Sequence, residues 1–186
     1  MIPEQVKKLL KRRISDDLLY AILLCARNGF LTKEDFSPRF LFHKKYEGFF
    51  EERDGRFLLT QKGKDVLDDF YFTLLLFNFK KKPTGVVVKK LLTVKVLILA
   101  ETLSYVDVRR CEKFIGTPTS QGISDYADAL HWYASYGFLR KRRGRGYEIT
   151  EKGRLALQNF FFIVWKARRS GASPASEVFE ENMPQL

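Results

Sequence analysis

Apolar side chains recur at helical spacing in most of the chain, with short breaks between the segments. This spacing predicts helices over residues 14–28, 38–47, 64–79, 90–105, 107–115, 120–136 and 155–166. Ser15 or Asp16 can cap the first of these helices, and Gly29 can end it. Between the helices, short runs of aromatic and aliphatic residues around charged turns indicate β-hairpins.

The hairpins belong to an internal repeat, which is the most informative feature of the sequence. One copy, GFFEERDGRFLLTQKGKDVLDDFYF, begins at Gly48, and the other, GFLRKRRGRGYEITEKGRLALQNFFF, begins at Gly137. After the turn the copies keep a constant spacing, so that Thr60 corresponds to Thr150. The second copy has one extra residue at the turn, where a hairpin tolerates a change of length.

Each copy predicts a helix, a hairpin and a second helix. A glycine ends the first helix, and a threonine can cap the second. The hairpin turns at Asp54 and Gly55 in the first copy, and from Gly144 to Gly146 in the second. With the helices upstream, this indicates a mainly α fold with small β-hairpins, of the α+β class.

The second copy carries a resemblance to a known family. Its helix ending in Gly137-Phe138-Leu139, its basic turn and its Thr150-Glu151-Lys152-Gly153 signature resemble winged-helix transcription regulators of the MarR and PadR kind. The resemblance implies two winged helix-turn-helix units in tandem. In such units the third helix enters the major groove of DNA, and the hairpin, called the wing, reaches a flanking phosphate or the minor groove.

Composition breaks suggest how the chain is divided. The polar run of lysines followed by Pro83 and Gly85 interrupts the helical pattern. We therefore expect a first unit over residues 1–82, which includes a basic N-terminal arm, a second unit over residues 83–169, and a flexible tail over residues 170–186.

The charge balance points to a polyanionic partner. The 186 residues contain 33 Lys and Arg against 22 Asp and Glu, which gives a net charge of +11. Double-stranded DNA fits this surplus better than a membrane surface, because no long apolar face accompanies the basic residues. Excess charge that serves only solubility is the alternative.

The sequence also suggests a compartment. It lacks an apolar signal-peptide core, a membrane span and a disulfide framework, since its two cysteines are isolated. We expect a protein of the reducing cytoplasm, associated with the nucleoid.

The second wing is the sharpest candidate for DNA contact. Its five cations are Arg140, Lys141, Arg142, Arg143 and Arg145. Their mutual repulsion would be relieved by phosphates, although a basic edge can also serve only to deter aggregation.

The preceding predicted helix offers polar side chains that can read bases or phosphates, namely Ser120, Gln121 and Ser124. The expected core stripe of this helix is Ile123, Ala127, Leu130 and Ala134, with Gln121, Asp125, Asp128 and Trp132 facing outward. Because carboxylates repel the DNA backbone, a solvated face is an equal alternative.

The first wing is acidic, with Glu51, Glu52 and Asp54 at its tip. Cations lie instead on the helix before it and at the N-terminus; we single out Arg39, Lys44, Lys45, Lys11, Arg12 and Arg13. One unit would then contact DNA by helix and arm, and the other by wing. The alternative is that the first unit binds a protein.

Nothing in the sequence predicts an enzyme, a metal site or a cofactor, since it lacks a phosphate-binding loop and a metal-spaced Cys/His set. We expect a DNA-binding transcription regulator. A plasmid-type or viral-type replication initiator and a tandem winged-helix interaction subunit of a chromosome-organising complex are the alternatives. The apolar helices at residues 64–79 and 155–166 predict packing against the second unit or against a second copy in a homodimer.

Overall fold

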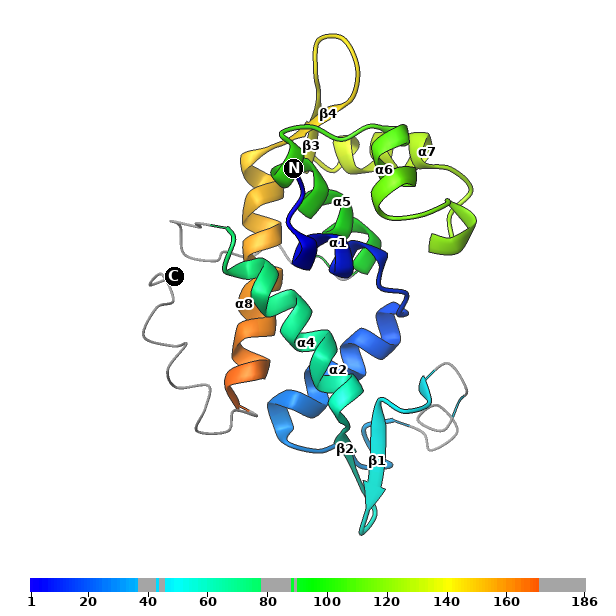
Figure 1. Ribbon diagram of the computed structural model, residues 1–186, viewed down its shortest axis with the longest axis vertical. Helices are drawn as coiled ribbons and strands as arrows, with labels where there is room; N and C mark the ends of the chain where they lie inside the picture. Colours follow the sequence, from blue (N-terminus) through cyan, green and yellow to red (C-terminus); the bar gives the residue numbers. More distant parts are fainter. Residues whose placement is uncertain (37–42, 44–45, 78–87, 89, 171–186) are drawn as a thin grey trace. The chain divides into compact units, whose positions relative to one another are not determined.

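The computed structural model describes residues 1–36, 43, 46–77, 88 and 90–170 (Figure 1). These residues are mainly helical, with two separate two-stranded antiparallel sheets, which confirms the α+β class. Contacts divide the chain into two compact units. The C-repeat unit comprises Met1–Arg13 and Lys81–Phe160, and the N-repeat unit comprises Ile14–Lys80 and Phe161–Leu186.

The C-repeat unit is built around one apolar helix. Its elements are α1 (Glu4–Lys11), α5 (Leu91–Leu103), α6 (Val108–Phe114), a short 3-10 helix η2 (Thr119–Gln121), α7 (Tyr126–Ser135), β3 (Leu139–Lys141), β4 (Tyr147–Ile149) and the beginning of α8 (Glu151–Ser170). The central helix, α5, contacts α1, α6 and β4. It is apolar around most of its circumference because its neighbours cover most of it.

Helix α1 is a structural part of the C-repeat unit. It buries Val6, Leu9 and Leu10 and packs on α5 and α6. Lys95, only 2% exposed in α5, donates from Nζ to the carbonyl oxygen of Arg12 at 2.6 Å, and so satisfies a carbonyl group at the end of α1. Residues 1–13 therefore pack with the second repeat copy, whereas the expected division placed them with the first.

The N-repeat unit contains α2 (Asp16–Asn28), β1 (Phe50–Arg53), β2 (Arg56–Leu59), α4 (Gln61–Leu74) and the end of α8. The Ser15 side chain caps α2 by accepting from the Leu18 amide at 3.1 Å, and Gly29 ends the helix in the left-handed conformation, as expected. Ala21, Cys25, Leu31 and Phe57 form a core cluster beneath the hairpin. Most of the helix predicted over residues 38–47 lies outside the described residues.

The second half of α8 belongs to the same unit as α4, whose apolar face includes Val66, Phe70 and Leu74, and two side-chain contacts join these parts of the chain. The Phe77 and Phe161 rings are 5.9 Å apart, and Arg168 Nε donates to Asp68 Oδ1 at 3.0 Å. The chain itself thus supplies contacts to part of the surface for which a homodimer was one expected partner, while Leu75 and Leu76 are 39% and 49% exposed. Helix α4 ends at Leu74, before the expected residue 79, and residues 78–79 lie outside the described part.

The third helix of the second copy begins later than predicted. Residues 120–125 are not part of it: Gly122 is left-handed at φ 70° after η2, and α7 begins at Tyr126. Asp125 accepts from the Asp128 amide at 2.7 Å and is the true cap. Within the expected core stripe Leu130 is buried but Ala127 is exposed, and the other buried residue of α7 is Tyr126, at its first position.

None of the helices in the described ranges is both long enough and apolar enough to cross a membrane.

The packing of α1 predicts that its apolar face stabilises the protein. Leu10→Ala should lower the free energy of unfolding by about 2–5 kcal/mol, since Leu10 is fully buried. Gln5→Ala, on the exposed side of the same helix, should change it by less than about 0.5 kcal/mol. Urea denaturation measures both values, and equal effects would contradict the packing of α1 on the C-repeat unit.

Candidate nucleic-acid interface

The net positive charge of the chain resides entirely in one unit. The C-repeat unit contains 20 Lys and Arg against 8 Asp and Glu, which gives +12. The N-repeat unit contains 13 against 14, which gives −1. The N-terminal cations and the basic hairpin therefore belong to the same unit, which the linear division of the sequence had separated.

The β3–β4 hairpin is fixed at its base by a third strand segment. Val106 forms an antiparallel bridge with Tyr147, in which each amide donates to the other carbonyl at 2.8 Å. The bridge requires glycine at position 146. Gly146 has a φ of 87°, and a Cβ there would clash with the Val106 carbonyl oxygen at 2.7 Å. The hairpin therefore leaves the body of its unit in a fixed direction (Figure 1).

A corner formed by Thr150, Lys152 and Gly153 ties α7, the hairpin and α8 together. Thr150 Oγ1 lies 2.5 Å from the Gly137 carbonyl oxygen and accepts from the Gly153 amide at 3.0 Å. Lys152 Nζ donates to the Tyr136 carbonyl oxygen at 2.7 Å, at the end of α7. A Cβ on Gly153 would collide with the Phe138 carbonyl group, so this position requires glycine.

The N-repeat unit repeats this corner. Thr60 donates to the Gly48 carbonyl oxygen and accepts from the Gly63 amide at 3.4 Å. Lys62 Nζ donates to the Glu47 carbonyl oxygen at 3.2 Å. The Thr-x-Lys-Gly signature therefore has a structural role in both copies, and its lysine donates to a backbone carbonyl group just before the hairpin.

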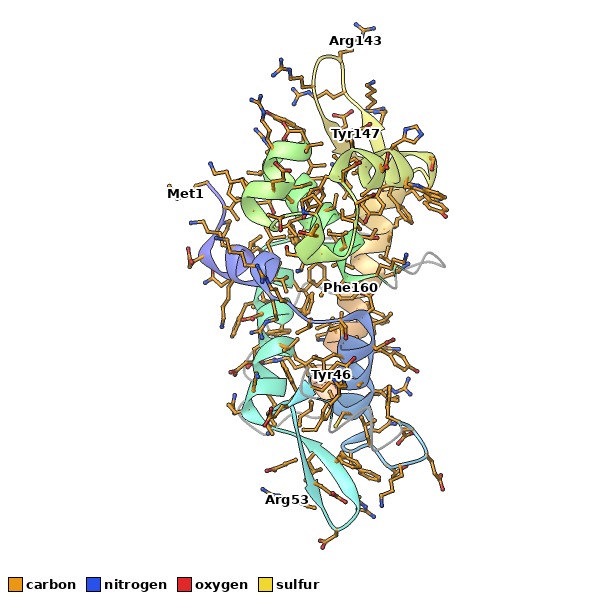
Figure 2. The ribbon with its side chains drawn as sticks, turned by 90° about the vertical axis from the view of Figure 1, so that its right-hand side faces the viewer. Met1, Tyr46, Arg53, Arg143, Tyr147 and Phe160 are labelled. Atoms are coloured by element: carbon orange, nitrogen blue, oxygen red, sulfur yellow. The ribbon has the colours of Figure 1, made fainter. Side chains whose placement is uncertain are left out.

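The cations of the second hairpin are all exposed. Arg140 pairs with Glu148 across the strands, with Nε 2.9 Å from Oε1. The Arg142 guanidinium lies 5.2 Å from the centre of the Tyr105 ring. Within the described residues, no carboxylate pairs with Lys141, Arg143 or Arg145. Figure 2 shows Arg143 at the far end of the loop and Tyr147 near its base, so the tip presents unneutralised charge.

The first hairpin has a similar backbone and the opposite charge. Its turn residues, Asp54 and Gly55, have φ values of 52° and 73°, which give the tight turn that was predicted. Glu51 pairs with Arg53 at 2.8 Å. Three other candidates of this copy, Arg39, Lys44 and Lys45, lie outside the described residues.

The polar candidates expected on the third helix lie elsewhere. Ser120 and Gln121 are in η2, where Ser120 Oγ donates to the Thr117 carbonyl oxygen at 2.7 Å. Gln121 Oε1 lies 3.4 Å from the buried Lys95 Nζ, so this side chain turns inward. Ser124 is exposed but precedes α7. These side chains do not form a reading face on a helix.

The N-terminal candidates follow α1. Lys11 is the last residue of that helix, and Arg12 caps it. Lys11 and Arg13 are exposed.

The outward face of α7 carries aromatic rings that the sequence reasoning did not select as site residues. Trp132 and Tyr136 are 58% and 55% exposed, and their ring centroids are 5.7 Å apart. Phe138 continues the line, 6.2 Å from Tyr136. The four-residue spacing of Trp132 and Tyr136 is the signal that would have indicated a shared helical face.

Helices α6 and α7 each bury one ionisable side chain, Cys111 in α6 and Tyr126 in α7. Burial, followed by the charges of Asp107 and Glu112, raises the pKa of the Cys111 thiol from 9.0 to about 12. Burial also raises the pKa of the Tyr126 hydroxyl, which donates to the Gly116 carbonyl oxygen at 2.9 Å. Both groups are therefore protonated at neutral pH. The described residues contain no cluster of His, Cys, Asp and Glu that could hold a metal ion.

The buried thiol predicts a loss of stability at high pH. Above its ordinary pKa of 9.0, Cys111 ionises in the unfolded chain but not in the folded one, so the free energy of unfolding falls as pH rises toward 12. Between about pH 8 and about pH 10.5, Cys111→Ala should reduce this fall by about 1–2 kcal/mol. Urea denaturation at both pH values tests this, and an unchanged pH dependence would contradict it.

No protein-family model matches the chain, and no curated protein or solved structure is significantly similar to it.

Proposed function

We propose that the chain is a DNA-binding protein, a transcription regulator, whose C-repeat unit holds double-stranded DNA. The observation that carries this proposal is the concentration of charge. One unit has a net charge of +12 and displays an exposed cationic hairpin, while the other unit is close to neutral. A polyanion relieves the repulsion between these cations and releases counterions on binding.

The order of elements supports a winged-helix arrangement of this unit. Helix α5, the Val106 bridge, helices α6 and α7, the β3–β4 hairpin and α8 follow one another as in the winged-helix plan. In the general plan the third helix approaches the groove, but α7 begins with two exposed carboxylates, Asp125 and Asp128, so in this proposal the hairpin, as the wing, supplies the contacts to the duplex. The N-repeat unit has a similar bridge, Leu31 with Phe57, and a similar hairpin, so the proposal is a tandem of two such units.

The N-repeat unit has a different role in this proposal. Its hairpin is acidic at the tip, with Glu51, Glu52 and Asp54, and so is unsuited to phosphate. Tyr20 is 60% exposed on its surface. These features favour protein contact by this unit, and an interaction subunit of a chromosome-organising complex is the second candidate function.

The proposal predicts that the second hairpin dominates DNA binding. Replacing Arg142, Arg143 and Arg145 with Ala should weaken binding to every duplex sequence. It should also reduce the log–log slope of affinity against salt by about two to three. Fluorescence anisotropy with a labelled duplex at several salt concentrations measures both effects.

A matched variant controls for net charge alone. Arg27→Ala, Lys33→Ala and Lys64→Ala together remove three exposed cations from the N-repeat unit and should leave the affinity nearly unchanged. Both triple variants should fold normally, because exposed charges contribute little to stability. Equal losses in the two variants would show a response to net charge only and would overturn the hairpin assignment.

Helix α1 should extend the phosphate contacts. Replacing Lys8, Lys11 and Arg13 with Ala removes three exposed cations of the C-repeat unit and should lower the salt slope further in the hairpin variant. An unchanged slope in the combined variant would place α1 outside the interface.

Sequencing of DNA fragments selected by the purified protein tests the regulatory assignment. A single operator-like sequence would support a transcription regulator. Iterated copies of one short sequence would indicate a replication initiator, and the absence of selected DNA would favour the interaction subunit.

A further inference from the structure

The exposed face of α7 is aromatic where a base-reading helix would be polar. Trp132 and Tyr136 lie one helical turn apart, are each more than half exposed, and have ring centroids 5.7 Å apart. Phe138, at the entrance to β3, is 6.2 Å from Tyr136. Trp132, Tyr136 and Phe138 therefore form a contiguous aromatic patch, and exposed patches of this kind mark interaction sites.

The beginning of the same helix is poorly suited to a duplex. Asp125 caps α7 by accepting from the Asp128 amide at 2.7 Å, which satisfies one of the amide groups that a phosphate would otherwise bind. The Asp125 and Asp128 side chains are both exposed in the first turn. Two carboxylates at this end repel the phosphate backbone, so the usual insertion of the helix N-terminus into the major groove is disfavoured.

The aromatic residues are instead followed directly by the cationic hairpin. Lys152 Nζ is bound to the Tyr136 carbonyl oxygen at 2.7 Å and lies 5.5 Å from the centre of the Phe138 ring. Leu139 and Arg140 follow Phe138 directly in β3, and the exposed tip cations come after them. Proteins that bind single-stranded nucleic acid combine aromatic rings, which stack on the bases, with cations, which contact the phosphate backbone.

We propose that this aromatic face, Trp132, Tyr136 and Phe138, stacks on unpaired DNA bases while the β3–β4 hairpin holds the adjoining phosphates. The preferred ligand is then DNA that contains both paired and unpaired segments, such as a fork. This inference rests on the proposed function, because the hairpin supplies the phosphate contacts.

The experiment compares a blunt duplex with a forked DNA of equal length and charge. The parent protein should bind the fork more tightly. Trp132→Ala and Tyr136→Ala should each weaken fork binding by about tenfold or more, the size expected of base–aromatic stacking, and leave blunt-duplex binding unchanged. Trp132→Phe should retain most of the affinity, because phenylalanine still offers a ring. Tyr20→Ala, at an equally exposed aromatic residue of the N-repeat unit, is the matched control and should have no effect.

A second measurement follows Trp132 directly. The chain has two tryptophans, so Trp165→Phe leaves Trp132 as the only one. Its fluorescence should be quenched by the fork and not by the blunt duplex. This readout comes from a variant that keeps the whole aromatic face, so it does not depend on the folding of the alanine variants.

The outcomes separate this inference from the proposed function. If the parent binds both DNAs equally and Trp132→Ala binds them as the parent does, the inference is overturned and the duplex-binding proposal stands; the aromatic face would then be a protein-docking surface. If the parent binds neither DNA, the proposed function fails and the inference fails with it.

Discussion

The arrangement of the C-repeat unit depends on one corner, where Thr150, Lys152 and Gly153 meet the end of α7. The threonine hydroxyl and the lysine ammonium group satisfy carbonyl groups that the ending helix leaves free, at Gly137 and Tyr136. The missing side chain of Gly153 lets α8 approach the Phe138 carbonyl group. The helix, the hairpin and the next helix are thereby fixed by backbone contacts, so the hairpin tip is not needed for the fold.

This separation explains how two similar hairpins can carry opposite charges. The corner recurs at Thr60, Lys62 and Gly63, but the N-repeat hairpin ends in an acidic tip. Since the tip side chains are exposed and contribute little to stability, their charge is free to differ between the copies. The same constraint that holds both hairpins leaves their surfaces open to different partners.

Local signals in the sequence predicted the local structure well. The Ser15 cap, the turn at Asp54 and Gly55 and the position of α5 all agree with the structure, because each depends on neighbouring residues. The late start of α7 was missed because Ser120 and Asp125 both resemble caps, and the left-handed Gly122 decides between them.

Local signals of this kind could not predict the packing between segments that are far apart in the sequence. The repeat indicated two units in chain order, whereas α1 packs with the second copy through contacts such as Lys95 with Arg12, 83 positions apart. Because this packing brings the N-terminal cations and the basic hairpin into one unit, we propose that the C-repeat unit alone binds DNA. A titration with a short duplex, followed by two-dimensional amide NMR, tests it directly. Shifts concentrated in residues 139–149 and in α1, with β1 and β2 unchanged, are the predicted result; shifts in β1 and β2 equal to those in β3 and β4 would contradict it.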